Sequence, residues 1–273
     1  MSWWQALILG LVEGVTEFLP VSSTGHLILA ERVLGIPADD NANAYAICIQ
    51  AGAILAVLLV YRERLLAMAK GVVGADPQGR RLLLMVLAAF VPAAVLGPVL
   101  DHPIERVLFG LWPVVFAWAA GGVGIVLFSR WSSERKGGEG IESVDLRRAL
   151  LIGLAQCVAM WPGTSRSLVT IVAAALLGLS LPAAVEFSFL LGLVTLGAAT
   201  AFKALGHGDE LLAAYGAAPI GVGFLTAAVS ALAAVTWMVR WIESHGLGVF
   251  AAWRIGLAVL VGGCILAGIL APG

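Results

Sequence analysis

The sequence predicts an all-α polytopic membrane protein, and its composition, the length of its apolar runs and its charge placement carry that prediction. Hydrophobic residues make up 60% of the 273 residues and charged residues only 12%, whereas a soluble domain carries about a quarter charged residues. The apolar residues gather in long uncharged runs, as in helices that cross a bilayer. The formal net charge of -1 gives no indication of a nucleic-acid partner. We therefore expect a lipid bilayer around this chain.

Eight apolar segments are expected, and six of them are near spanning length. These six runs cover residues 44–61, 82–100, 107–128, 187–202, 217–239 and 249–271. The other two, 3–36 and 149–185, are interrupted midway by Pro, Gly and hydroxyl residues. Each of their halves is too short to cross a bilayer alone, so we expect two re-entrant helical hairpins. Irregular backbone at membrane depth is tolerated where it lines a cavity or is buried in protein.

The two interrupted segments resemble each other. "ALILGLVEGVTEFLPVSSTGH" can be laid over "ALLIGLAQCVAMWPGTSRSL", which places Glu13 on Gln156 and Ser23 on Ser165. We predict two repeats, 1–145 and 146–273, each with one hairpin and three spans. Three crossings are an odd number, so the two repeats must have opposite orientations. Inverted repeats with broken helices are typical of transporters, whose sites lie at the repeat interface.

Positive charge predicts the orientation. The loops 62–81 and 130–148 contain ten of the 16 Lys and Arg residues, and Arg240 and Arg254 flank the loop after the fifth span. If the hairpins do not cross, all twelve lie on one side, which the positive-inside rule makes cytoplasmic. Both termini then lie on the side opposite the cytoplasm. The first hairpin enters from outside, the second enters from the cytoplasm, and their tips meet.

The first hairpin carries two carboxylates. Glu13 and Glu17 are four residues apart and share one helix face. A solvated face is the ordinary explanation of such a pair, but here the flanks are apolar, and ionisable groups inside a membrane usually mark a functional site. Two close carboxylates repel each other unless a cation or a shared proton intervenes. We predict that Glu13 and Glu17 bind a divalent cation, Mg²⁺ or alternatively Ca²⁺, together with substrate phosphate.

Hydroxyl residues and a histidine follow these carboxylates. Helix capping accounts for one of Ser22, Ser23 and Thr24. It does not account for His26, which can act as a general base or as a nucleophile. The residues alone do not decide whether Ser23 or His26 attacks phosphorus.

The second tip, "WPGTSRSLVT", has the features of an anion site. Arg166 is a permanent charge between two apolar halves, in a hydroxyl-rich turn that opens a helix. Snorkelling to the interface is the alternative, but N–H groups at a helix start bind phosphate, and the guanidinium fork matches its oxygens. We therefore predict a phosphoryl-transfer site. Its catalytic residues are Glu17, Ser23, His26 and Arg166, and its phosphate-binding residues are Arg166, Ser165, Ser167 and Thr170.

These motifs carry a family resemblance. "EGVTEFLPVSSTGH" and "PGTSRSLVT", with "IQAGAILAV" and "EFSFLLG", resemble the undecaprenyl diphosphate phosphatase family, also called bacitracin-resistance proteins. The resemblance implies a bacterial membrane enzyme that removes one phosphate from a polyprenyl diphosphate lipid, recycles the carrier for cell-wall precursors and confers bacitracin resistance. It also implies interdigitated inverted repeats and an active site that faces the periplasm. The family's functional positions correspond to Glu13, Glu17, Ser23 and His26 in the first motif. In the second motif they correspond to Ser165, Arg166, Ser167 and Thr170.

Two other functions are compatible with parts of the pattern. A transporter or flippase of isoprenoid phosphates would need the anion clamp but not an activated nucleophile, so the Ser23–His26 pair favours the enzyme. A purely structural membrane protein would not need the buried charges. A homodimer is the candidate assembly.

Overall fold

The computed structural model describes residues 1–37, 39–133 and 137–272, apart from the side chains of residues 40, 101–103, 105, 106, 133 and 203–209. Within these residues six helices are long and apolar enough to cross a membrane. They are α3 (Asp40–Val60), α5 (Pro77–Leu108), α6 (Leu111–Ser133), α9 (Leu181–Tyr215), α10 (Ala217–His245) and α11 (Gly248–Leu266). The prediction of an all-α polytopic membrane protein is confirmed.

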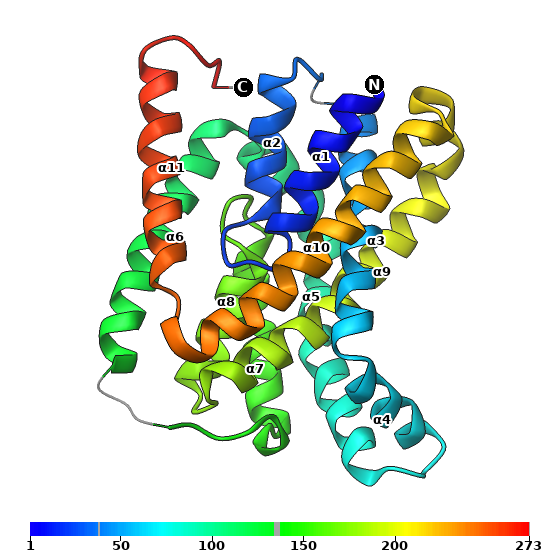
Figure 1. Ribbon diagram of the computed structural model, residues 1–273, viewed down its shortest axis with the longest axis vertical. Helices are drawn as coiled ribbons and strands as arrows, with labels where there is room; N and C mark the ends of the chain where they lie inside the picture. Colours follow the sequence, from blue (N-terminus) through cyan, green and yellow to red (C-terminus); the bar gives the residue numbers. More distant parts are fainter. Residues whose placement is uncertain (38, 134–136, 273) are drawn as a thin grey trace.

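Four shorter helices form the two predicted hairpins. The first consists of α1 (Trp3–Thr16) and α2 (Ser23–Val33), and the second of α7 (Leu146–Gln156) and α8 (Arg166–Leu176). At about 1.5 Å per residue, none of the four reaches across an apolar layer about 30 Å thick. The hairpins point toward each other from opposite ends of the molecule, and their tips lie near its middle (Figure 1). The wider pairing of residues 1–145 with 146–273 as inverted repeats stays a prediction.

The two tips share one backbone conformation. Ser22 and Ser165 are the only non-glycine residues in the described chain with positive φ, at 74° and 76°. Each is an N-cap whose Oγ accepts a hydrogen bond from the backbone N–H three residues later, at Gly25 and at Leu168. The structure therefore corrects the sequence register by one residue, because Ser22, rather than Ser23, is the counterpart of Ser165. By the same register, Ser23 corresponds to Arg166.

The bounds of several elements differ from those expected. The span expected at 187–202 starts six residues earlier, at Leu181, because Ser180 and Pro182 provide a helix start before the polar Glu186. The expected hairpin 149–185 correspondingly loses its last residues to α9. The span expected at 107–128 begins at Leu111, because α5 continues to Leu108. Hydropathy locates only the apolar part of a helix, whereas the backbone hydrogen bonds of the helix continue beyond that apolar part.

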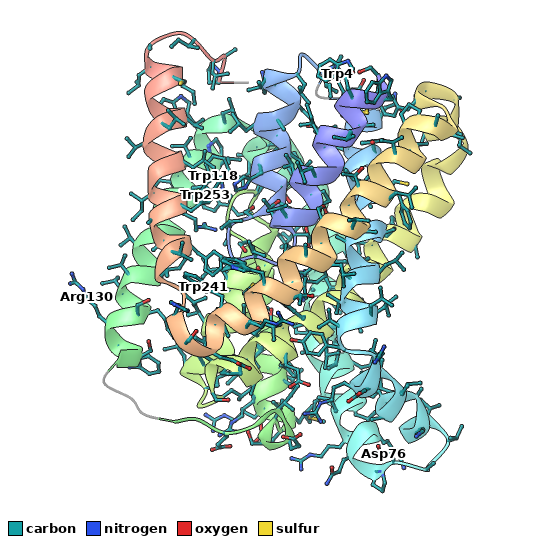
Figure 2. All side chains as sticks on the ribbon, in the orientation of Figure 1. Trp4, Asp76, Trp118, Arg130, Trp241 and Trp253 are labelled. Carbon is teal, nitrogen blue, oxygen red and sulfur yellow. The ribbon has the colours of Figure 1, made fainter. Side chains whose placement is uncertain are left out.

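The basic loops lie at the end opposite both termini (Figure 1). One loop folds into α4 (Arg62–Val72), and the other contains η1 (Ile141–Ser143). Asp76 lies at this end (Figure 2). Arg135 and Lys136, counted in the second loop, lie outside the described residues. Arg254, which the charge count placed at the cytoplasmic surface, is wrongly assigned there, since its side chain is 0% exposed inside the bundle.

Small residues bring the first hairpin against a spanning helix. Gly10 and Gly14 of α1 lie against α10, and an added Cβ at either position would collide with the backbone of Gly223 or Ala227. Such close backbone approach is typical of helix packing in membranes. It carries Glu13, on the same stretch of α1, into the protein interior.

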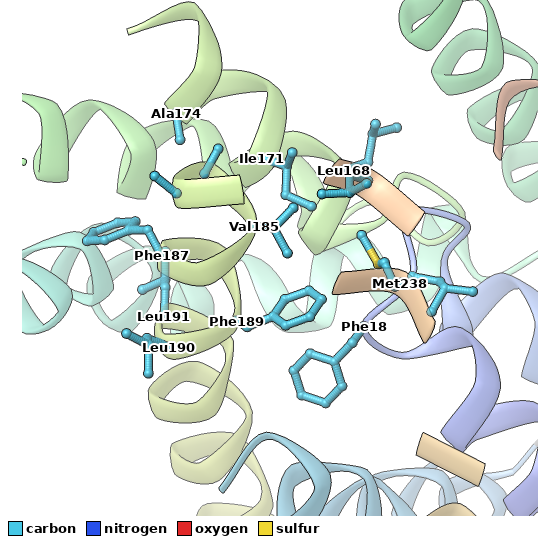
Figure 3. Close-up of a cluster of buried hydrophobic side chains, with 14 of the residues drawn as sticks. Phe18, Leu168, Ile171, Ala174, Val185, Phe187, Phe189, Leu190, Leu191 and Met238 are labelled. Carbon is cyan, nitrogen blue, oxygen red and sulfur yellow. The ribbon is translucent and has the colours of Figure 1, made fainter. Parts of the chain in front are cut away.

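A core of apolar side chains supports the other side of the tips. Phe18 of the first tip packs edge-on against Phe189 of α9, with 5.2 Å between ring centroids. Leu168 and Ile171 of α8 and Met238 of α10 belong to the same buried cluster (Figure 3). Side chains of α8, α9 and α10 thus pack against the tips. This close packing makes the tips a rigid support for polar groups.

Candidate functional site

The second tip is hydrogen-bonded directly to the backbone of the first. Ser167 Oγ donates to the carbonyl oxygen of Leu19 at 2.9 Å, and Ser165 Oγ donates to the same oxygen at 3.5 Å. Ser165 is 146 positions from Leu19 in sequence, and Ser167 is 148 positions from it. Both hydroxyls are buried, so the bonds are protected from water and fix the relative position of the two tips.

Arg254 of α11 is hydrogen-bonded to both tips. Its Nη2 donates to the carbonyl oxygens of Gly163 and Ala117, each at 2.8 Å, and its Nη1 donates to that of Pro20 at 3.3 Å. Gly163 and Pro20 belong to opposite tips, and Ala117 belongs to α6. A planar guanidinium is suited to several fixed acceptors at once. Arg254 therefore joins both tips and a spanning helix through carbonyl oxygens.

Glu17 is the centre of the site. Its Oε1 pairs with Arg166 Nη2 at 3.0 Å. Its Oε2 accepts a short hydrogen bond from Ser23 Oγ and a weaker one from Gln50 Nε2 at 3.4 Å. The side chain is buried, and so is that of Ser23. One carboxylate thus links the predicted anion clamp to a hydroxyl group, across the contact between the two hairpins.

The guanidinium of Arg166 is held on several sides. Besides Glu17, it donates from Nη1 to the carbonyl oxygen of Ser188 at 3.1 Å, and it lies over the Phe18 ring at 5.2 Å. Gly192 provides the space, since an added Cβ there would collide with the guanidinium. Arg166 Nε has no hydrogen-bond partner in the described structure. The clamp is positioned in advance and still has an unused donor.

Thr170 and Ser167 support the clamp rather than face the cavity. Thr170 Oγ1 donates to the carbonyl oxygen of Arg166 at 2.9 Å and lies 2.6 Å from Ser188 Oγ. Both Thr170 and Ser167 are fully buried. The structure therefore brings all four predicted phosphate-binding residues together, but only Arg166 and Ser165 line the cavity described next.

A cavity of about 590 Å³ opens between the tips. Its polar wall includes Glu17, Ser23, Gln50, Gln156, Ser165 and Arg166. It continues between α5 and α9 along apolar side chains that include Phe90, Pro98 and Phe202, and it reaches Phe109 at the connection from α5 to α6. The cavity thus combines a small polar end with a long apolar one, which suits an amphiphile with an anionic head.

A larger apolar cavity, of about 950 Å³, lies on the other side of the first tip, between α1, α10 and α11. Leu11, Val229 and Trp237 are among its lining residues, and none of the described residues that line it is titratable. Of these two cavities, only the smaller one has charged side chains in its described lining, and it is therefore the candidate site.

His26 lies outside the site cavity, although three of its near neighbours in sequence line it. Its Nδ1 is 2.7 Å from the carbonyl oxygen of Ser22, and its Nε2 accepts from Trp253 Nε1 at 3.0 Å. The ring also stacks on Trp253 and meets Trp118 edge-on, and the two tryptophans are neighbours between α6 and α11 (Figure 2). Both ring nitrogens are thus engaged, and the catalytic role of His26 stays a prediction.

Glu13 is the least satisfied side chain near the site. It is 1% exposed, and neither carboxylate oxygen has a hydrogen-bond partner in the described structure. The charges of Glu17 and Arg166 both act on it. Among the described residues no three His, Cys, Asp or Glu side chains gather as a metal site. Any bound cation would thus have two protein carboxylates at most and would need further oxygens from elsewhere.

Sequence reasoning missed four residues of the site. Gln50 contacts Glu17, Ser188 contacts Arg166, and Gly192 leaves room for the Arg166 guanidinium. Arg254 joins the two tips. Three of the four lie in "IQAGAILAV" and "EFSFLLG", the two stretches that carried the family resemblance without any assigned role. The available signal was a polar or glycine residue inside an otherwise apolar run.

Comparison with known proteins finds relatives that match nearly the whole chain. The model of the family described as "Bacitracin resistance protein BacA" matches residues 6–260. A relative from Sorangium cellulosum named undecaprenyl-diphosphatase is 44% identical over 265 residues, which cover 96% of this chain and 86% of the relative. A relative from Chromobacterium violaceum named undecaprenyl-diphosphatase 1 is 43% identical over 271 residues, covering 98% of each chain.

Proposed function

The chain belongs to the bacitracin resistance protein BacA family, and from this premise we propose that it is an undecaprenyl-diphosphatase. As a multi-pass membrane hydrolase it removes the terminal phosphate of undecaprenyl diphosphate, recycles the lipid carrier for cell-wall polymers and confers bacitracin resistance. The observation that carries the proposal is Glu17, which contacts both Ser23 and Arg166 at the polar end of the cavity. The long apolar end offers room for part of a polyprenyl chain.

We take Ser23 as the nucleophile. Its hydroxyl already donates to Glu17 and lines the cavity, whereas both ring nitrogens of His26 are engaged elsewhere. Glu17 takes the hydroxyl proton as the Ser23 oxygen forms a bond to the terminal phosphorus. The anhydride P–O bond breaks, and undecaprenyl phosphate leaves. Water then attacks the phosphoserine, which restores Ser23 and releases inorganic phosphate.

Arg166 stabilises the charge of the transferred phosphoryl group. Its guanidinium is fixed by Ser188 and packed over Phe18 before substrate binds, so little reorganisation accompanies the reaction. Its unpartnered Nε is available to a phosphate oxygen. Ser165, at the start of α8, adds a hydroxyl group beside it. His26 has a supporting role in this proposal, since it holds the carbonyl of Ser22 next to the nucleophile.

Glu13 and Glu17 suit a divalent cation, Mg²⁺ or Ca²⁺. The two Glu13 oxygens accept no hydrogen bond from the described residues, and a hard cation takes one or two carboxylates plus substrate phosphate oxygens. When bound, the cation would offset the negative charge of the diphosphate beside two carboxylates. Without it, those carboxylates would oppose substrate binding.

Phosphate release from undecaprenyl diphosphate by the purified protein in detergent, with and without Mg²⁺, tests the proposal. We expect release that a chelator suppresses and that the Ser23→Ala variant lacks. A flippase of isoprenoid phosphates is the alternative, and it would move lipid across vesicles without releasing phosphate. The absence of release from a well-folded wild-type protein would refute the enzyme.

We further propose that the site faces the periplasm of the bacterial inner membrane. The basic loops lie opposite both termini, and the cavity extends to Phe109, at the far end of α5 from Asp76. In a variant without Cys48, Cys157 and Cys264, a membrane-impermeant maleimide applied to intact cells should label Ala217→Cys and not Ala75→Cys. The reverse pattern would invert the topology.

The homodimer stays a prediction of the proposal. Light scattering of the purified protein, corrected for bound detergent, measures the mass of the assembly. A single-chain mass would contradict it.

A further inference from the structure

We infer that Gln156 is a further substrate-binding residue, whose amide Nε2 donates a hydrogen bond to a phosphate oxygen of the lipid diphosphate. This inference rests on the proposed function and adds a residue to it, because the motifs of the second tip begin only after this position. Gln156 is the last residue of α7 and lines the same cavity as Ser23, Ser165 and Arg166.

The position of Gln156 is rigid. Gly153, one turn earlier on α7, packs so closely on α5 that an added Cβ would collide with the backbone of Ala89. The side chain of Gln156 is only 3% exposed. Thr195 Oγ1 lies 2.9 Å from the carbonyl oxygen of Leu191 and 3.3 Å from Gln156 Oε1, and its one hydroxyl proton is shared between these two acceptors. The amide is thus held by its oxygen, which leaves its nitrogen for another acceptor.

Among the residues that the structure describes, none provides an acceptor for that nitrogen. Gln156 Nε2 is buried and has no hydrogen-bond partner in the described structure. Buried donors in proteins are almost always paired, because leaving one unpaired in a dry interior is costly. A ligand or an ordered water must therefore supply the acceptor. Within a cavity built to accept an anionic lipid head, that acceptor is a phosphate oxygen.

The other unpaired groups support this assignment. Six buried side-chain atoms of the described residues lack a partner, and four of them belong to Glu13, Gln156 and Arg166. The unused acceptors are on the first hairpin, at Glu13, and the unused donors are on the second, at Gln156 and Arg166. Phosphate oxygens of one ligand in the cavity would satisfy both donors of the second hairpin, whereas Glu13 does not line the cavity.

The contrast between the hairpins explains why an amide is suitable here. Gln156 occupies the position in α7 that Glu13 occupies in α1. A neutral donor adds a hydrogen bond on the anion-binding side without adding negative charge near Arg166. A carboxylate at position 156 would repel the diphosphate and compete with it for the guanidinium. Gln156→Glu is therefore expected to be more harmful than a neutral substitution.

The test compares initial rates of phosphate release by the purified protein across a series of undecaprenyl diphosphate mole fractions in detergent. We expect Gln156→Met to raise the apparent KM about tenfold while kcat stays within about threefold, because a hydrogen bond made before and during reaction contributes uniform binding. Gln156→Glu should raise the KM further. Gln78→Met, the same change at an exposed position, should leave both constants unchanged, and thermal unfolding checks that all variants are folded.

The outcomes separate the two proposals. If wild-type protein releases phosphate and a folded Gln156→Met variant keeps the wild-type KM, Gln156 is not a substrate ligand and the proposed function stands. A fall in kcat at constant KM would likewise overturn the binding role. If the wild-type protein releases no phosphate, the proposed function is wrong, and the inference is wrong with it.

Discussion

Gly192→Ala should lower the activity of the protein without unfolding it. Gly192 lies in α9, and its missing side chain makes room for the guanidinium of Arg166. An alanine Cβ would collide with Nη1 and would lie 2.7 Å from Nη2. The helix backbone is packed in the core beside Leu190 and Leu191, so the guanidinium must move instead. The substitution therefore displaces the clamp while adding only a methyl group.

The expected loss follows from the contacts of the guanidinium. Arg166 bonds Glu17 at 3.0 Å and the carbonyl oxygen of Ser188 at 3.1 Å. A hydrogen bond to a charged group contributes about 1.5–3 kcal/mol. If displacement removes one such bond from the transition state, kcat/KM falls about 10- to 150-fold. Folding should change little, because alanine favours the helix by up to about 1 kcal/mol and offsets the local strain.

The assay is phosphate release from undecaprenyl diphosphate, with thermal unfolding measured on the same preparation. Gly197→Ala is the matched control, since it makes the same change in the same helix and an added Cβ there meets no atom within 4 Å. We expect Gly197→Ala to retain wild-type kcat/KM and a similar unfolding midpoint. Comparison of the two variants separates displacement of Arg166 from the general effect of alanine in α9.

Two results would refute the reasoning. Wild-type kcat/KM in Gly192→Ala would mean that the position of Arg166 does not limit the reaction. An equal loss of activity in Gly197→Ala would mean that α9 itself, and not the guanidinium, is sensitive to substitution.

Four further substitutions test the contacts of the site. Arg166→Lys keeps the charge but loses the planar fork, so kcat/KM should fall at least about tenfold with little change in unfolding temperature; near-normal turnover would argue against the phosphate clamp. Glu17→Gln should cost more activity than Glu13→Gln, because only Glu17 bonds both Ser23 and Arg166, and Mg²⁺ titration should show a weaker metal dependence in both. An unchanged rate and Mg²⁺ dependence in Glu17→Gln would remove that carboxylate from the metal site. Arg254→Met leaves three carbonyl oxygens without their donor and should reduce the free energy of unfolding by about 3 kcal/mol or more, whereas a wild-type unfolding curve would show that the tips do not depend on it.

Local features of the fold were readable from the sequence because they depend on neighbouring residues. Uncharged runs of about 20 residues indicate spans, and the breaks at Pro20 and Pro162 in short apolar segments predicted two hairpins that the structure contains. The chemical groups of the site were readable as well. Glu17, Ser23 and Arg166 stand out because charged or hydroxyl residues within apolar segments are costly unless they serve a purpose.

Contacts between distant segments were decided only by the tertiary structure. Ser23 and His26 are three residues apart, but the packing of α11 turns His26 toward Trp253 and leaves Ser23 beside Glu17. The sequence places Arg254 next to a loop and predicts a surface charge, but in the structure its side chain on α11 is buried in the interior. Periodicity and spacing fix the face of a single helix, but which faces meet depends on packing between segments more than a hundred residues apart. For that reason the sequence by itself determined the charged and hydroxyl groups at the two tips, whereas the fold decided which of them touch and brought Gln50, Ser188, Gly192 and Arg254 to them.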